Sequence, residues 1–490
     1  MANKHATLAA LFTDIADAIR EKTGDASSIV ADDFPDVIRE RLEVIPPTPT
    51  YLTFSSPSSF TLKVKDTTKH WDGTLEYSTD ISTWTTWDGT TTLSSTTSGS
   101  DNVLYLRGIG NTKIIGYSTS NYGWVLTGSD IKCTGNIENI LDYEIVNSGS
   151  HPSMANYCYH GMFKDCTALT QAPDLPATTL TTECYRLMFE GCTSLTQAPA
   201  LTATMLADSC YYGMFKNCTN LTNAPALPAT TLFRFCYSSM FFGCTSLTQA
   251  PALPATTLDN NCYSSMFRDC TALTQAPDLP ATTLTTECYV SMFEGCTSLT
   301  QAPELPATTL ANSCYLGMFF GCTALTKAPA LRATTLADSC YKNMFYNCTS
   351  LTQAPELPAT TLAYSCYRGM FNRCRNLTKT PSELPATKLE IDCYRFMFEF
   401  TAITAIPRIM ATTYIMDSCK GMFDDIKTLN VYSRSGPGHT YGWTAPAPVS
   451  CSGMFGSDDG ESEWAKLDGS NFPNSGTPTE GTTYYFATSD

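Results

Sequence analysis

Histidine is scarce in this chain, and basic residues are outnumbered by acidic ones. Only five histidines occur among 490 residues, and no two of them stand at the spacing of metal ligands. The 30 lysines and arginines face 46 acidic residues and form no basic stripe of the kind that displaces counterions from a nucleic-acid duplex. We therefore expect no metal, no nucleic acid and no membrane surface among the partners.

Long hydrophobic runs are also missing. Nothing approaches the run of about 18 apolar residues that a membrane-spanning helix needs. The first residues hold one short apolar patch at 8–12, without the basic start and small-residue cleavage site of a signal peptide, so we expect no export by that route.

Motifs of catalysis and cofactor binding are absent as well. The sequence has no GxSxG, P-loop, GxGxxG or CxxC motif. The acidic loop at 458–461 fits no full set of calcium ligands. We expect a protein that is not an enzyme and needs no cofactor.

What the chain does have is a 26-residue unit that recurs eleven times. Its first cysteine marks the register, with one inserted residue, Ser382, before the tenth copy; the positions are Cys158, Cys184, Cys210, Cys236, Cys262, Cys288, Cys314, Cys340, Cys366, Cys393 and Cys419. A fixed period of this length predicts a solenoid of stacked units. Such a protein presents a long surface and does not enclose a pocket.

Each unit divides into two halves. Leu-Thr-x-Ala-Pro-x-Leu is short, extended and interrupted by proline, which predicts a brief strand. The sequence Cys-Tyr-x-x-Met-Phe-x-x-Cys then predicts a helical turn or two, with both cysteines and the methionine on one face. The expected fold class is α+β, a leucine-rich-repeat type of solenoid that spans roughly 50 Å at about 4.8 Å per unit.

The cysteine content invites a disulfide interpretation, but the placement favours free thiols. Of 22 cysteines, most fall at the two fixed positions of the repeat. In a helix the two positions would be about 12 Å apart along the axis. That separation exceeds the roughly 7 Å that a disulfide allows between Cα atoms. Buried, unpaired thiols are expected, and bridges between stacked repeats remain the alternative.

The regions outside the repeats predict further units. Residues 1–45 contain two short helical patterns too small to bury a core, and we interpret them as an attachment segment that is followed by a proline-rich linker. Residues 46–130 indicate a small antiparallel β domain, in which Trp71, Trp84 and Trp87 either fill the core or stack on sugars. Residues 131–157 and 431–490 are expected to cap the solenoid at 158–430.

Two sets of outward residues are candidates for ligand binding. The first consists of large aromatic and basic residues at positions that differ between repeats, typical of binding hot spots: Arg186, Tyr212, Phe233, Arg234, Phe235, Phe242, Tyr346, Tyr364 and Arg368. The second is a mildly acidic strip on the strand side, suited to glycans: Gln171, Gln275, Gln301 and Gln353 beside Asp174, Asp278, Glu304 and Glu356. Drift at unconstrained positions is the competing interpretation for the first set.

Two further expectations concern an aromatic cluster and a histidine. Phe233, Arg234, Phe235 and Phe242 are expected to cluster in neighbouring turns of the array. His160 stands at one of the variable positions, and we expect an ordinary surface side chain there.

The repeat resembles the leucine-rich repeats of the BspA-like type, whose Phe-x-x-Cys-x-x-Leu-Thr core is read here as Phe215-Lys-Asn-Cys218-Thr-Asn-Leu221-Thr222. It departs from the common form in having Cys-Tyr-x-x-Met-Phe where a shorter Ala-Phe pair is usual. The resemblance covers about 155–430. It implies a surface adhesin and leaves the ligand open.

Residues 11–24 and 33–38 are similar to the opening of bacteriophage tail and receptor-binding proteins. That resemblance implies attachment to other virion proteins through residues 1–45 and a bacterial cell-surface receptor, glycan or protein, as the partner. A bacterial surface adhesin, a structural spacer and a carbohydrate hydrolase are the alternatives. Whether the chain forms a homo-oligomer is left open.

Overall fold

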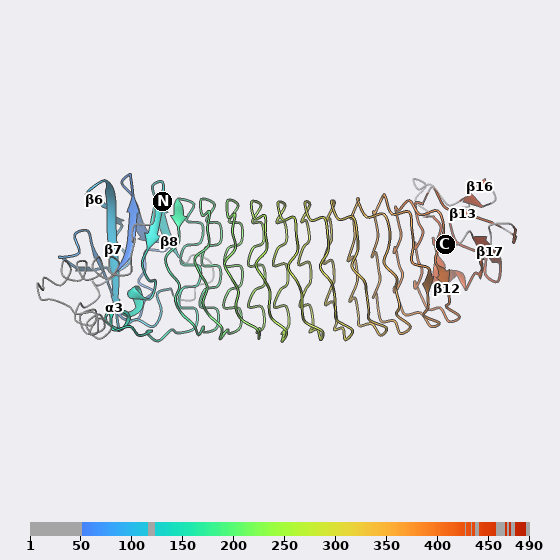
Figure 1. The fold of residues 1–490 in the computed structure, drawn as a ribbon, viewed down its shortest axis with the longest axis horizontal. Helices are drawn as coiled ribbons and strands as arrows, with labels where there is room; N and C mark the ends of the chain where they lie inside the picture. The colour runs from blue at the N-terminus through green and yellow to red at the C-terminus, as the bar shows by residue number, and fades with distance from the viewer. Residues whose placement is uncertain are drawn as a thin grey trace, which may run out of the picture.

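The computed structural model describes residues 51–115, 123–426, 428–432, 434–436, 441–456, 466–467, 470–471 and 476–486. These residues form a long rod in which the repeats stack side by side, with sheets at the N-terminal end and short strands at the C-terminal end (Figure 1). The predicted attachment segment at 1–45 and the loop at 458–461 lie outside the described residues.

An antiparallel sheet forms the N-terminal end of the rod, as the alternating pattern predicts. Its strands lie in the order β10-β9-β1-β7-β3-β4, and β6 also pairs with β7. The bounds are β1 Leu52–Ser56, β3 Thr74–Ser78, β4 Thr85–Thr86, β6 Thr96–Ser98, β7 Asp101–Ile109, β9 Ile131–Thr134 and β10 Leu169–Gln171. The pair β9–β10 is parallel and joins this sheet to the first repeat.

A second sheet packs beside the first and completes the core of this end. It has the order β5-β2-β8, with β2 Thr61–Val64, β5 Leu93–Ser94 and β8 Trp124–Thr127. Trp71 and Trp87 are buried, with their ring centroids 5.2 Å apart, so they are core residues and cannot stack on a sugar.

One helix, α3 at Asn139–Asn147, lies against β7 and closes the N-terminal end of the array. A Cβ atom at Gly108 of β7 would lie only 1.8 Å from the carbonyl oxygen of Ile140, so the helix can approach the strand this closely only over a glycine. Just before α3, the amide of Ile137 donates to the carbonyl of Asp174 in the first repeat, at 3.0 Å. The residues before the helix therefore cover the first repeat.

The return half of each repeat is not helical, and the helix prediction is wrong. Residues 158–426 contain no α-helix. In the return half, alternate amides donate in two directions. Met188 donates to Tyr185 within its own repeat at 3.2 Å, whereas Phe189 donates to Met214 of the next repeat at 2.9 Å. An α-helix would use every amide within the segment, and here half of them hold the repeats together.

A left-handed residue at every fourth position produces this arrangement. In the second repeat these residues are Glu183, Leu187 and Gly191, with φ of 56°, 53° and 74°. Each one reverses the chain, so that residues alternate in pairs between the inside and the outside. Cys184, Tyr185, Met188 and Phe189 all point inward and are at most 1 % exposed.

Identical side chains stack along the rod in columns. Phe267 lies between Phe241 and Phe293, with ring centroids 5.7 Å from each and rings nearly parallel. The spacing is within the favourable range for stacked aromatic pairs. A parallel tyrosine column runs from Tyr159 to Tyr394.

Tryptophans contact the phenylalanine column near both ends, and at the C-terminal end Phe455 also stacks on Phe486 at 5.9 Å. Trp124 meets Phe163 edge-on at 6.0 Å, and Trp443 meets Phe455 edge-on at 6.3 Å. Trp443 lies in β14, Tyr441–Thr444, which pairs with β17, Thr483–Phe486. The other C-terminal elements are β11 Glu383–Leu384, β12 Arg408–Ile409, β13 Asn430–Val431, α4 Pro448–Cys451, β15 Lys466–Leu467 and β16 Ser470–Asn471.

All 22 cysteines are buried and unpaired, as predicted, although the helical geometry behind that prediction does not hold. The second cysteine of a repeat has a specific partner: the thiol of Cys270 donates to the carbonyl oxygen of Phe241 at 3.0 Å, and the same bond recurs from Cys192 to Cys374. Burial raises the pKa of Cys184 to about 12, and it raises the pKa of Cys192 well above its ordinary value. The thiols are therefore protonated and inert at neutral pH.

The stability of the array is expected to depend on the phenylalanine column. Phe267→Ala leaves a cavity between two stacked rings and should lower the free energy of unfolding by about 3–5 kcal/mol, measured by urea denaturation. Phe233→Ala, the same change at a side chain that is 42 % exposed, is the control and should cost less than about 0.5 kcal/mol. Equal effects of the two substitutions would contradict the stacked core.

Thiol titration tests the state of the cysteines. Because every thiol is buried and protonated, Ellman's reagent should react with none of them in the native protein at neutral pH. In guanidinium chloride without reductant it should titrate all 22. A markedly lower number in denaturant would reveal disulfides between repeats and overturn this description.

Candidate ligand-binding surfaces of the array

The array offers two outward surfaces that correspond to the two halves of the repeat. We call the outward residues of the return half the turn face. We call the depression beside the Leu-Thr-x-Ala-Pro-x-Leu segments the strand groove. The predicted aromatic and basic residues lie on or beside the turn face, and the predicted acidic strip lies along the strand groove.

On the turn face, several predicted binding residues are engaged with a neighbouring repeat. The guanidinium of Arg186 lies 4.3 Å from the ring centre of Tyr212, one repeat further along. Arg368 forms an ion pair with Asp392, with Nη1 and Oδ2 separated by 3.0 Å. Both arginine side chains are less than one-third exposed, so their planar groups serve contacts between repeats first.

The position after the phenylalanine forms a continuous row of matched side chains. Glu190 lies between Lys164 and Lys216, with N–O distances of 2.6 and 3.4 Å. Lys216 and Arg268 approach the ring of Phe242 from the two neighbouring repeats, each at 5.5 Å from its centre. The buried columns are nearly the same in every repeat. The contact between one repeat and the next therefore differs along the rod mainly in these outward pairs.

The row continues with Arg268 and Glu294, whose Nη2 and Oε1 atoms lie 2.9 Å apart. Further along, Phe320 and Tyr346 stack with ring centroids 4.5 Å apart. Tyr346 is therefore half-buried in a contact between repeats.

Left-handed positions of the turn face also match between neighbours. Gly213 follows Leu187 in the next repeat, and a Cβ at Gly213 would lie 2.5 Å from a leucine methyl carbon. The missing side chain of a glycine thus leaves room for the large side chain of the repeat before it. At this pair, packing between neighbouring repeats constrains the outward residues.

The predicted cluster of Phe233, Arg234, Phe235 and Phe242 is only partly present. The guanidinium of Arg234 lies over the adjacent Phe235 at 5.0 Å, and Phe233 is exposed beside them. Phe242 instead contacts Lys216 and Arg268. Phe233, Arg234 and Tyr364 are the predicted residues that are exposed, Tyr364 at 49 %.

His160 is not a surface side chain, and that expectation is wrong. Its residue is only 5 % exposed, its ring stacks on Tyr157, and its Nδ1 lies 3.8 Å from a carboxylate oxygen of Glu183. Burial, with the nearby cations of Arg186 and Lys164, lowers the pKa of His160 to about 4. The imidazole is therefore neutral in the folded protein at neutral pH.

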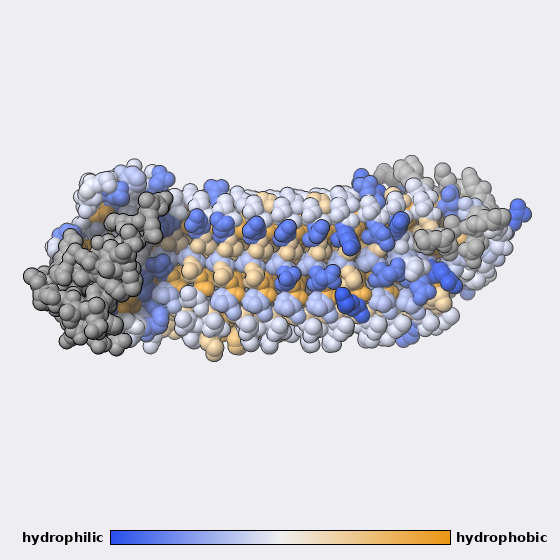
Figure 2. Space-filling model, in the orientation of Figure 1, coloured by the Kyte–Doolittle hydropathy of each residue, from blue (hydrophilic) through white to orange (hydrophobic). Residues whose placement is uncertain are grey.

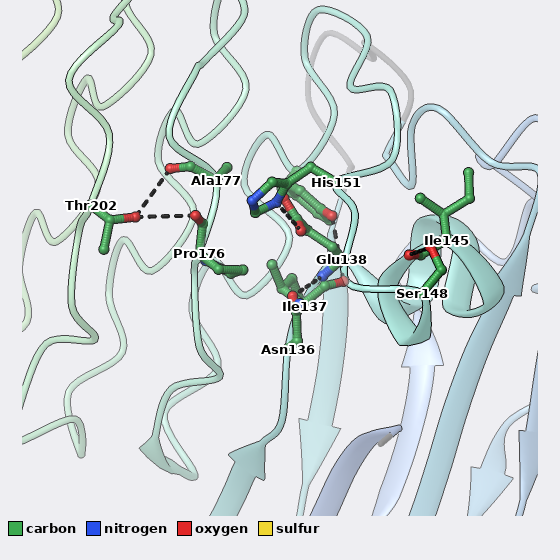
Figure 3. Close-up of polar contacts among 10 residues, drawn as sticks. Asn136, Ile137, Glu138, Ile145, Ser148, His151, Pro176, Ala177 and Thr202 are labelled. Atoms are coloured by element: carbon green, nitrogen blue, oxygen red, sulfur yellow. Dashed lines mark hydrogen bonds and ion pairs between the residues drawn. The ribbon is translucent and has the colours of Figure 1, made fainter. Parts of the chain in front are cut away.

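The junction between the N-terminal end and the array contains a second histidine contact. His151 points toward Glu138, with Nδ1 2.8 Å from Oε2 (Figure 3). Glu138 is 1 % exposed, and its other carboxylate oxygen accepts no hydrogen bond from any described residue. In the next repeats the Thr202 hydroxyl donates to the Pro176 carbonyl at 3.1 Å, so this region is fixed by bonds from repeat to repeat.

Along the strand groove, side-chain amides form one wall. The wall consists of one exposed residue per repeat: Gln171, Gln197, Asn223, Gln249, Gln275, Gln301, Lys327, Gln353 and Lys379. Parallel backbone bridges hold these residues in register from repeat to repeat, for example Gln249 with Gln275 and Gln275 with Gln301. We call this row the amide row.

The opposite wall contains the predicted acidic residues. It consists of Asp174, Ala200, Ala226, Ala252, Asp278, Glu304, Ala330 and Glu356, all exposed. Glu304 meets Arg332 at 3.4 Å, and Glu356 accepts a hydrogen bond from the hydroxyl of Ser382 at 2.7 Å. At Ala200, Ala226, Ala252 and Ala330 the wall is low and apolar.

The groove between the two rows is hollow at more than one place. A cavity of about 550 Å³ is lined by residues of the seventh and eighth repeats, among them Lys327, Ala330, Gln353 and Glu356. One of about 470 Å³ is lined by Lys132 and by residues of the first two repeats, most of them at equivalent positions. On the face shown in Figure 2, hydrophilic and apolar rows run parallel to the long axis of the rod. The same hollow therefore occurs at equivalent positions in two separate pairs of repeats.

Other kinds of site were sought across the described residues. They contain no group of three or more histidine, cysteine or carboxylate side chains that could hold a metal ion. They also contain no helix that is long and apolar enough to cross a membrane.

The protein is a repeat solenoid with two distinct outward faces, and comparison with known proteins identifies its family. A family model described as BspA type Leucine rich repeat region matches residues 141–274, 206–316 and 260–401, which together are more than half of the chain. The chain belongs to this family, whose repeats indicate a surface- or adhesin-like repeat protein. No curated protein and no solved structure matches the chain.

The buried histidine makes a pH dependence testable. An unfolded histidine titrates near pH 6.5. Between pH 6.5 and 4 the unfolded chain therefore binds a proton that the folded chain excludes, so stability falls as the pH falls through this range. His160→Ser, which installs the residue found at the same position in Ser238 and Ser264, should remove about 3 kcal/mol of this loss.

The measurement is the thermal midpoint at pH 7 and at pH 4.5 for both proteins. A smaller drop in the variant supports a buried neutral imidazole. The same drop in both proteins would show that His160 does not carry the effect.

Proposed function

We propose that this protein is a non-enzymatic adhesin of a bacteriophage tail that presents the array to a glycan or protein receptor on the bacterial surface. The observation that carries the proposal is the division of every repeat into two parts. The recurring Cys, Tyr, Met and Phe residues are buried in columns, whereas most of the residues that differ between repeats lie on the outward turn face. A scaffold of this kind can change its surface without changing its core.

The geometry of the rod supports a role in display. The backbone of each repeat is bonded to the next along the axis, so the two faces are straight and rigid over many repeats. A long rigid surface can contact an extended receptor at several points, and several weak contacts then add up to useful affinity. This use requires no catalytic group.

The assignment to a phage tail rests on residues 11–24 and 33–38, which resemble the opening of tail and receptor-binding proteins. In this proposal residues 1–45 attach the rod to other virion proteins, and the protein is a component of the virion.

A bacterial surface adhesin is the second candidate function, favoured by the membership in the BspA-type repeat family. The two candidates share the binding role and differ in location. Cleavage of the protein on intact cells by an added protease would favour the bacterial location.

Binding to bacterial cells tests the proposal. Fluorescently labelled full-length protein should bind saturably to strains that are hosts of the phage and not to resistant strains. Phe233→Ala/Phe235→Ala tests the exposed part of the predicted turn-face site. A receptor held there should be bound at least tenfold more weakly by this variant.

Mass spectrometry of purified virions supplies the second half of this test. Detection of the protein in virions supports the location, and its absence from them contradicts it. Failure to bind any host strain would contradict the adhesin role and would leave a structural spacer.

A further inference from the structure

We infer that the strand groove binds an uncharged, linear, hydroxyl-rich polysaccharide that lies along the axis of the rod over several repeats. This inference rests on the proposed adhesin role and names the site and the ligand chemistry within it. Its first support is the recurrence of the groove: the two cavities, of about 550 and 470 Å³, occupy equivalent positions in different pairs of repeats.

Side chains offer the regular contacts along this face. The backbones of neighbouring repeats are joined there at isolated parallel bridges, as between Gln275 and Gln301. A peptide laid along the rod axis would cross these segments and could not extend them as a strand. This favours a ligand recognised by side-chain hydrogen bonds over a protein strand.

The amide row has the chemistry that hydroxyl groups need. A glutamine side chain both donates and accepts, as does a sugar hydroxyl. Gln249, Gln275 and Gln301 are exposed and make no hydrogen bond through their side chains to any described residue. They are spaced by the repeat, about 4.8 Å, which is close to the length of one sugar unit in an extended chain.

The charge of the middle of the groove disfavours polyanions. Between Gln197 and Gln301 neither wall contains a lysine or arginine, and the facing wall carries Asp278. A polymer of phosphates or carboxylates would be repelled there, because like charges across a surface are unfavourable. Outside this stretch the groove also holds Lys132 and Lys327, and Glu304 is paired with Arg332. The low wall at Ala200, Ala226 and Ala252 leaves room for the apolar face of a sugar ring.

The closing experiment uses the full-length chain and defined probes. Isothermal titration is carried out with cello-oligosaccharides, chito-oligosaccharides, β-1,3-glucan oligomers and α-1,6-glucan oligomers, and with polyglycerol phosphate as the polyanion. At least one neutral series should bind, with an affinity that rises with chain length until the groove is filled.

The matched variants are two sets of three exposed residues in the same region of the array. Gln249→Ala/Gln275→Ala/Gln301→Ala should weaken binding at least tenfold, because three amides are lost from the wall. Thr256→Ala/Thr282→Ala/Thr308→Ala, on the adjoining exposed turn, should leave binding within twofold. Unchanged circular dichroism and thermal midpoints show that both variants are folded.

The outcomes separate this inference from the proposed function. No binding by any neutral series, equal binding of polyglycerol phosphate, or unchanged binding after loss of the three glutamines would overturn the inference. If host cells are still bound in those cases, the adhesin role stands and the receptor lies on another face. If neither cells nor sugars are bound, both fail.

Discussion

The structure depends on the backbone hydrogen bonds that run from repeat to repeat through the return half. Left-handed residues at every fourth position turn alternate amides toward the next repeat, as at Phe189 and Met214. The same geometry sends Cys, Tyr, Met and Phe inward together. The aromatic columns, the buried thiols and the straight outward faces all follow from this one arrangement.

The sequence was sufficient to predict the period, the solenoid, the antiparallel strands near the N-terminus and the free thiols. It misled over the return half, because residues four apart share a face in a helix and also in this chain of turns. The overlooked signal was the recurrence of Gly, Asn, Asp and Ser at every fourth residue of the return half, as at Gly161, Asp165 and Asn217. Gly, Asn and Asp tolerate positive φ better than most residues.

The candidate surfaces were predictable in composition but not in their contacts. Arg186 and Tyr212 are obvious binding residues by type, yet they contact each other across a repeat boundary. His160 is buried against Tyr157 and Glu183, which no local pattern indicates. Because the buried cores of the repeats are nearly identical, a repeat could pack against the wrong neighbour. The matched outward pairs on the turn face favour packing against the native neighbour. In the proposed function, the strand groove is the surface that faces the ligand.

The most direct test of this account is the removal of residues 262–287, one complete repeat. Because each repeat bonds to its neighbours through the same backbone positions, the shortened chain should fold. Its maximum dimension by small-angle X-ray scattering should fall by about 4.8 Å, and the circular dichroism spectrum should keep its shape. A half-repeat deletion should abolish folding. An unfolded one-repeat deletion, or a folded half-repeat deletion, would contradict an array held by backbone bonds in register.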